Sequence, residues 1–192
     1  MTAGVVLFDG TVTSAEERRD FLALLGLAPA ARLLEIGAEA YDASDESFDA
    51  VLCIDAIAQL RDRGAALAEW ARVVKPGGRI LYTDPAIVAG LVTSEELAMR
   101  SAMGFFVFSP QGENESLIEA AGLRLVRADD ATDTLAVLAR RRHAERRDRE
   151  AKLVAAEGRE RYDAHQRFLD VAHRLAAERR LARIAFLAEK VP

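Results

Sequence analysis

Two aspartates stand at the ends of apolar runs, where a carboxylate could meet a ligand. Asp55 ends the run 48–55, and Asp84 ends the run 79–84. If these runs are parallel strands, both carboxylates lie at the edge of the sheet where ligands of α/β proteins bind. Each also has an ordinary structural use, Asp55 as a helix N-cap and Asp84 as a turn residue before Pro85. The sequence leaves both interpretations open.

A histidine is the candidate for proton transfer. His165 lies on the apolar stripe of a predicted helix, where it is either a packed core or lid residue or a general base facing an acceptor pocket. Cys53 lies inside an apolar run and is expected to be a packed thiol rather than a nucleophile. With one cysteine and three histidines in the chain, no zinc-type cluster and no metal site are predicted.

Composition indicates the class of protein that carries these residues. The 192 residues are 51% apolar and 30% charged, which is typical of one globular domain. A net charge of −5 gives no general attraction to a phosphate backbone, so nucleic acid is not expected as a partner. No apolar stretch approaches the about 20 residues of a membrane span, and the first 25 residues lack the order of a signal peptide. A cytoplasmic location is therefore predicted.

Apolar spacing and capping residues predict alternating helices and strands. The predicted strands are 32–37, 48–55, 79–84, 123–127 and 183–188, and the predicted helices are 15–25, 62–74, 113–121, 132–158 and 161–180. The stretch between 85 and 112 is expected to consist mainly of loops. This alternation predicts a layered α/β fold in a single domain, 1–192, with residues 131–180 as a helical insertion before the last, antiparallel strand.

Three segments together resemble the class I SAM-dependent methyltransferases, in particular the branch that modifies small molecules. They are Leu-Leu-Glu-Ile-Gly at 33–37, Asp-Glu-Ser-Phe-Asp-Ala-Val at 45–51, and Trp-Ala-Arg-Val-Val-Lys-Pro-Gly-Gly-Arg-Ile at 70–80. The resemblance implies a Rossmann-like sheet, S-adenosyl-L-methionine (SAM) as cofactor and methyl transfer to a small-molecule acceptor. It implies cofactor contacts for Glu35, Gly37, Ala38 and Asp55. It also implies an acceptor pocket near Asp84, Phe105, Phe106 and Phe108, although core packing is the ordinary explanation for such phenylalanines.

The sequence departs from the family pattern after Gly37. The Gly-x-Gly continuation is replaced by Ala38-Glu39-Ala40, and residues 38–44 stand where the family has roughly half a hundred residues forming two strands and two helices. An internal deletion would remove the second and third strands and the acid that binds the ribose. Losing that hydrogen bond forfeits about 1.5–3 kcal/mol of cofactor binding. The alternative function is therefore a degenerate, non-catalytic module for binding or dimerisation.

The same departure affects association. Without a second strand, the first strand becomes a sheet edge with unpaired backbone groups. A second copy of the chain could cover that edge in a homodimer, or a helix from 132–180 could fold over it within one chain. The sequence favours the homodimer only slightly.

Overall fold

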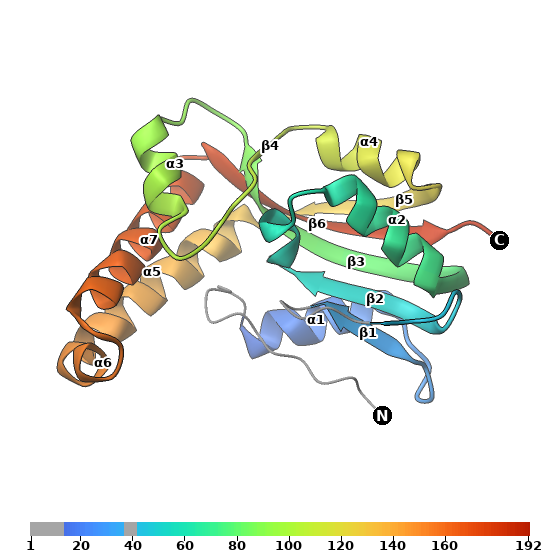
Figure 1. Cartoon of the computed structure of the whole chain (residues 1–192), viewed down its shortest axis with the longest axis horizontal. Helices are drawn as coiled ribbons and strands as arrows, with labels where there is room; N and C mark the ends of the chain where they lie inside the picture. The colour runs from blue at the N-terminus through green and yellow to red at the C-terminus, as the bar shows by residue number, and fades with distance from the viewer. Residues whose placement is uncertain (1–13, 37–41) are drawn as a thin grey trace.

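The computed structural model describes residues 14–36 and 42–192, and its centre is a six-stranded sheet (Figure 1). The strands are β1 (Leu33–Ile36), β2 (Phe48–Ile54), β3 (Val74–Val88), β4 (Ser109–Pro110), β5 (Leu123–Asp130) and β6 (Leu181–Lys190). They are ordered β1-β2-β3-β6-β5, and β4 pairs with β3. β1, β2 and β3 are parallel, whereas β6 is antiparallel to both of its neighbours. The predicted α/β class and the reduced sheet with an antiparallel last strand are confirmed.

Helices cover the two faces of the sheet and extend beyond one end. They are α1 (Ala15–Leu25), α2 (Arg63–Val73), α3 (Ser94–Arg100), α4 (Glu113–Ala120), α5 (Thr132–Asp148), α6 (Glu150–Glu157) and α7 (Arg159–Ala177), with a short 3-10 helix η1 (Ala56–Gln59). Figure 1 shows α2 and α4 on one face and α1 on the other. In the same view α5, α6 and α7 form a helical arm, with α3 beside α7.

Three elements differ from the sequence expectation. The stretch expected to be loops contains α3, which begins after Thr93 in a capping box: Thr93 and Glu96 each accept the other's backbone N–H. The helix predicted over 132–158 divides at Arg149, whose φ of −113° and ψ of 16° are not helical. β3 begins at Val74, before the predicted strand, because that residue already pairs with Phe48 of β2.

The turn inside β3 explains its Pro-Gly-Gly sequence. Gly77 has a φ of 73°, a conformation that glycine adopts at no steric cost. A Cβ on Gly78 would lie 2.8 Å from the carbonyl oxygen of Asp49, so a side chain cannot fit there. The chain therefore turns sharply at this point and enters the sheet beside β2.

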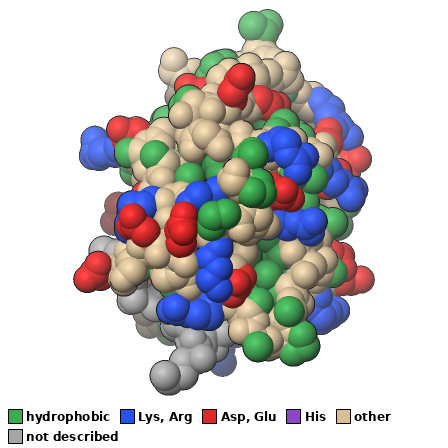
Figure 2. Space-filling model, turned by 90° about the vertical axis from the view of Figure 1, so that its right-hand side faces the viewer, with side chains coloured by type: hydrophobic (Ala, Val, Ile, Leu, Met, Phe, Trp, Pro, Cys, Tyr) green, Lys and Arg blue, Asp and Glu red, His purple; other side chains and the backbone are tan. Residues whose placement is uncertain are grey.

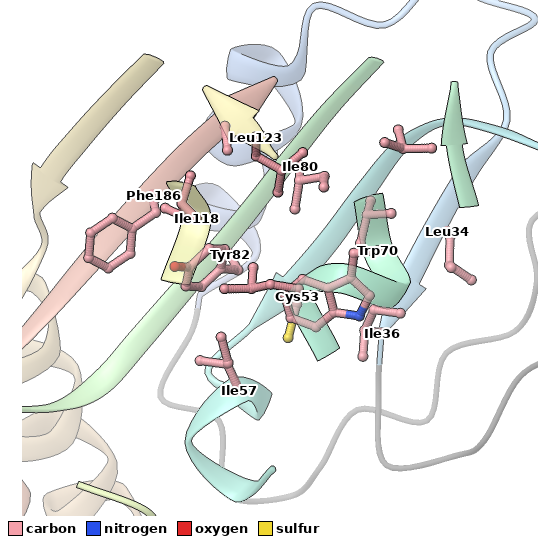
Figure 3. Packing of buried hydrophobic residues seen from close by; sticks show 14 of the residues in the cluster. Leu34, Ile36, Cys53, Ile57, Trp70, Ile80, Tyr82, Ile118, Leu123 and Phe186 are labelled. Atoms are coloured by element: carbon pink, nitrogen blue, oxygen red, sulfur yellow. The ribbon is translucent and has the colours of Figure 1, made fainter. Parts of the chain in front are cut away.

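The main core lies between the sheet and the helices α2 and α4 (Figure 3). Its aromatic centre is a row of three rings, with centroids 5.8 Å apart between Trp70 and Tyr82 and 5.1 Å apart between Tyr82 and Phe186. Cys53 is fully buried in this core, and burial raises the pKa of its thiol to about 12. It is a packed thiol, as the sequence predicted.

The opposite face of the sheet is covered by α1. Ser14 caps the helix by accepting the backbone N–H of Glu17, and Gly26 ends it with a φ of 62°. Phe21 and Leu25 then pack against Leu52 and neighbouring residues of the central strands. These contacts fix α1 against the central strands of the sheet.

Charges are spread over the surface rather than gathered by sign. Figure 2 shows basic, acidic and apolar side chains interspersed over one face of the molecule. Within residues 14–36 and 42–192, no helix combines the length and the apolar character needed to cross a membrane.

Candidate functional site

The carboxyl end of β2 is closed by a buried polar contact with β3. Asp55 follows β2 with a φ of 59°, and its backbone N–H donates to Thr83 Oγ1 at 2.8 Å. The Thr83 hydroxyl donates to Asp55 Oδ1 at 2.7 Å. Asp55 stands at the N-cap position of η1, but its side chain makes no capping hydrogen bond there. The N-cap interpretation of this residue is therefore wrong.

A buried arginine completes this cluster. Arg183 of β6 is fully buried, and its Nε donates to Asp55 Oδ1 at 2.8 Å while its Nη1 pairs with Glu17 of α1. Burial lowers the pKa of Arg183, but the two carboxylates outweigh that effect and raise it. Four residues from α1, β2, β3 and β6 thus form one ionic network, which we call the Arg183 network: Glu17, Asp55, Thr83 and Arg183.

Asp84 is the centre of a second network, at the carboxyl end of the β3 segment paired with β2. Its carboxylate pairs with Arg63 of α2 and accepts from Asn114 at 2.8 Å and from Ser109 at 3.0 Å. The backbone N–H of Ala86 also donates to it, at 3.0 Å. Asp84 is fully buried, and both of its carboxylate oxygens accept hydrogen bonds from groups of the protein. It positions β4, α2 and α4 around the strand end.

The residues expected to contact the cofactor are only partly described. Glu35 of β1 forms a two-point ion pair with Arg18 of α1, at 2.6 and 3.1 Å. Gly37 and Ala38 lie outside the described residues. Among the residues predicted for this role, Glu35 and Asp55 are both held by arginines, so their carboxylates are already engaged.

The aromatic segment, residues 105–108 between α3 and β4, has one phenylalanine at the surface and two that pack inward. Phe105 is half exposed, with the guanidinium of Arg61 4.8 Å from its ring centroid. Phe106 packs inward, with its centroid 6.4 Å from that of Phe108 and 6.1 Å from that of Phe168 on α7. The structure therefore brings Phe106 and Phe108 together but leaves Phe105 at the surface.

The predicted histidine joins the inner part of this cluster. His165 is 6% exposed, and its ring meets Phe168 edge-on at a centroid distance of 6.1 Å. Arg100, at the end of α3, lies against the faces of Phe106 and Phe168. We call these residues the aromatic cluster: Arg100, Phe106, Phe108, His165 and Phe168.

Sequence reasoning missed the basic members of these sites. Arg63 and Arg183 read as ordinary helix and strand residues, and Arg100 falls in the stretch expected to be loops. The Thr93–Glu96 capping box was the available signal for α3, since Thr-Ser-Glu-Glu is a helix-start pattern. No local signal marks Arg183, because its partners are 128 and 166 positions away in the chain.

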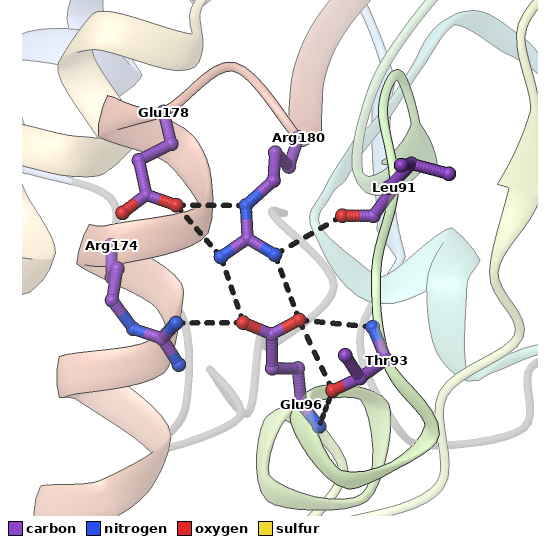
Figure 4. Close-up of polar contacts among 6 residues, drawn as sticks. All are labelled: Leu91, Thr93, Glu96, Arg174, Glu178 and Arg180. Atoms are coloured by element: carbon purple, nitrogen blue, oxygen red, sulfur yellow. Dashed lines mark hydrogen bonds and ion pairs between the residues drawn. The ribbon is translucent and has the colours of Figure 1, made fainter.

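A clamp on Glu96 fixes α3, and with it Arg100, against α7 and β6 (Figure 4). The Glu96 carboxylate binds Arg180 at 2.7 and 2.8 Å and Arg174 at 2.7 Å, and it accepts the Thr93 backbone N–H at 2.9 Å. Arg180 and the backbone of Thr93, followed by Arg174, lower the pKa of Glu96 to about 2. The clamp joins elements that are far apart in sequence around the aromatic cluster.

Replacing Glu96 with glutamine is expected to lower the Tm by about 2–4 °C at pH 7. A carboxyl whose pKa falls on folding stabilises the protein above its unfolded pKa, and it loses that contribution as the pH falls toward the folded value. The Tm difference between wild type and Glu96→Gln should therefore shrink between about pH 4.5 and pH 2.

The neighbouring Glu95 is exposed in the same helical turn, so Glu95→Gln is the matched control and should leave the Tm nearly unchanged. Thermal unfolding followed by circular dichroism across this pH range makes the comparison. Equal Tm values for the two variants at pH 7 would contradict a role for the clamp.

A hollow of about 600 Å³ lies at the other end of the strands, beside the Pro-Gly-Gly turn of β3 and the end of α1. It borders the amino ends of the parallel strands, whereas ligands of this fold class bind at the carboxyl ends. We therefore place the candidate site at the Arg183 network and the aromatic cluster. Across the described part of the chain, no group of three or more metal-binding side chains is found.

Part of the chain is similar in sequence to known methyltransferases. Residues 4–82 match a family model described as a methyltransferase domain. A methyltransferase of Streptomyces halstedii, GfsG, is 32% identical over 96 residues, which are 47% of this chain and 34% of that protein. These sequence matches, each covering less than half of the chain, and the sheet order support its relationship to the class I SAM-dependent methyltransferases.

Solved structures show the same fold at low identity. The cyclopropane synthase MmaA2 from Mycobacterium tuberculosis has a TM-score of 0.78 and 16% identity, over 98% of this chain and 90% of that one. Phosphoethanolamine N-methyltransferase 2 of Haemonchus contortus, solved with S-adenosyl-L-methionine, has a TM-score of 0.69 and 17% identity, over 79% and 35% of the two chains. The chain spans about a third of the length of the curated Streptomyces relative.

Proposed function

We propose that this chain binds SAM at the carboxyl ends of β1 and β2 and transfers its methyl group to a small-molecule acceptor. The observation that carries the proposal is the position of the aromatic cluster. The segment that carries Phe106 is hydrogen-bonded through Val107 to Ala58 of η1, directly after β2, so these rings and His165 lie beside a strand end of the kind where ligands of the fold bind. The apolar walls favour a compact, largely apolar acceptor.

The proposed reaction asks little of the protein besides positioning. Bound SAM supplies a methyl group that is open to in-line displacement. Phe106 and Phe168 would hold the acceptor, and fixed geometry of this kind is the main source of rate in such a displacement. His165 is the proposed base for an acceptor with an acidic hydroxyl, because it stands at the edge of the Phe168 ring.

The described residues fit the cofactor only in part. They provide the strand ends, which the buried contacts of the Arg183 network hold together. However, Glu35 and Asp55 already pair with Arg18 and Arg183, so neither offers a free carboxylate to the ribose hydroxyls. We therefore expect the isolated chain to bind SAM with a Kd above about 100 μM. At 1 mM SAM, such binding stabilises the fold by at most about 1.4 kcal/mol.

Isothermal titration with SAM at low micromolar protein tests this. A weak but saturable transition above about 100 μM is the expected result. A Kd of a few micromolar would show that the cofactor site is complete and that the expected weak affinity is wrong. An absence of binding at about 5 mM would contradict the methyltransferase proposal and support a non-catalytic binding module.

The edge of β1 supports a further proposal, that two copies of the chain associate. Within the described residues β1 pairs only with β2, and its Leu34 and Ile36 already lie in the main core. What β1 can still offer to a second copy is therefore its outer backbone edge, whose N–H and C=O groups can pair with another strand. Light scattering at tens of micromolar is expected to give twice the monomer mass of 21.0 kDa. A mass of 21.0 kDa at every concentration would contradict the dimer.

A further inference from the structure

Arg100 occupies an unusual environment for a cation. It ends α3 with only 2% of its surface exposed. Its guanidinium lies 4.6 Å from the ring centroid of Phe106 and 4.5 Å from that of Phe168. These distances are within the range of cation–π contacts, so the guanidinium packs against two neighbouring rings whose centroids are 6.1 Å apart.

The polar contacts of Arg100 differ from those of the two other fully buried arginines. Arg63 pairs with Asp84, and Arg183 pairs with Asp55 and Glu17. The Arg100 side chain forms no hydrogen bond or ion pair with the residues that the structure describes, and its Nη1 is buried without a partner. A buried charge without a hydrogen-bonding counterion is strongly unfavourable, so this arrangement needs an anion to offset it.

The position of Arg100 connects it with the candidate site. Phe106, whose ring it contacts, precedes Val107, and the backbone N–H of Val107 donates at 2.7 Å to Ala58 of η1, directly after β2. Burial lowers the pKa of Arg100 to about 10, so the guanidinium remains protonated at neutral pH. The same Phe168 ring meets His165 edge-on. Arg100 therefore stands among the groups that would hold the acceptor.

We propose that Arg100 recognises a carboxylate on the acceptor, whose aromatic body packs against the Phe106 and Phe168 rings. The planar fork of an arginine matches a carboxylate with two parallel hydrogen bonds. The two neighbouring rings, Phe106 and Phe168, would favour a flat apolar body next to that anion. The assignment to the acceptor rests on the proposed methyltransferase function, whereas the anion site itself does not.

A fluorine-labelled probe tests the site without turnover. We expect 4-fluorobenzoate to bind the wild-type chain saturably in a ¹⁹F NMR titration, and the neutral 4-fluorobenzamide to bind at least about tenfold more weakly. Arg100→Met should weaken benzoate binding at least about tenfold. Arg100→Lys should fall in between, because it keeps the charge and loses the fork. If Arg100→Met fails to fold, Arg100→Lys alone provides the comparison with wild type.

The matched control is Arg61→Met. Arg61 lies 4.8 Å from the Phe105 ring centroid, a similar contact at the exposed surface, so this variant should bind benzoate like wild type. Equal benzoate affinity in wild type and Arg100→Lys or Arg100→Met would overturn the proposal. So would the absence of benzoate binding to wild type at about 10 mM.

A further experiment decides whether Arg100 binds the acceptor or the cofactor, since SAM also carries a carboxylate. If Arg100 serves the acceptor, SAM titrations should give the same Kd for wild type and Arg100→Lys. A parallel loss of SAM affinity and competition between SAM and benzoate would assign Arg100 to the cofactor and overturn the acceptor assignment. Benzoate binding in a chain that does not bind SAM would leave the anion site standing while the proposed function fails.

Discussion

Arg183→Met is expected to lower the free energy of unfolding by about 3–5 kcal/mol. The substitution leaves the carboxylates of Asp55 and Glu17 buried without their cation, and breaking a buried pair by removing one partner has a cost of this size. One Glu17 oxygen is already buried without a hydrogen-bond partner, so the network has no spare donor to compensate. Urea unfolding at pH 7, followed by far-UV circular dichroism, measures the change.

Arg179→Met is the matched control for this prediction. Arg179 also pairs with two carboxylates, those of Asp130 and Asp133, but its side chain is 53% exposed whereas that of Arg183 is fully buried. Exposed pairs contribute about 0–1 kcal/mol, so this variant should stay close to wild type. A similar loss in both variants would show that burial of the Arg183 network is not what matters.

Asp84→Asn is expected to have an effect of the same order, about 3–5 kcal/mol of unfolding free energy. Its carboxylate is the counterion of the buried Arg63 and also accepts from Ser109 and Asn114. The neutral amide removes that counterion and turns one acceptor into a donor, which leaves buried groups unsatisfied. Urea unfolding again gives the magnitude.

A local readout distinguishes this loss from a general weakening. Ser109 lies in β4, directly after the aromatic residues 105–108. In Asp84→Asn, the hydrogen exchange of the amides of residues 105–109 should accelerate more than that of amides elsewhere in the sheet. Asp45→Asn is the control, since Asp45 also pairs with an arginine, Arg72, through a side chain that is 76% exposed. An unchanged exchange pattern in Asp84→Asn would contradict the positioning role of Asp84.

The elements with local signals were predicted well. Apolar runs marked β1 and β2, Ser14 and Gly26 delimited α1, and the Pro-Gly-Gly turn placed the segment of β3 that pairs with β2. The reduced Rossmann-like sheet with an antiparallel last strand is also confirmed, in the order β1-β2-β3-β6-β5. The helix α3 was missed because its seven residues are too short to show a clear apolar period, although its capping box was present.

The candidate site was predicted less completely. Asp55 follows β2 as predicted. β3 continues past Asp84 to Val88, so Asp84 is not the turn residue considered from the sequence and ends only the segment that pairs with β2. What the two carboxylates do depends on Arg183 and Arg63, which come from other parts of the chain. Phe106 and His165 were singled out separately, and no local pattern indicates that they meet around Phe168.

Periodicity, caps and turn residues act over a few neighbouring positions, so the α/β class and the resemblance to methyltransferases could be inferred from sequence alone. Which charges are buried, and with which partner, depends on how distant elements pack and became visible only in the folded chain. Arg100, Arg63 and Arg183 have the same side chain, yet one packs against two rings and two hold carboxylates. That difference arises from packing between separate elements, which no local pattern encodes: Arg63 is 21 positions from Asp84, and Arg183 is 128 and 166 positions from its two carboxylates.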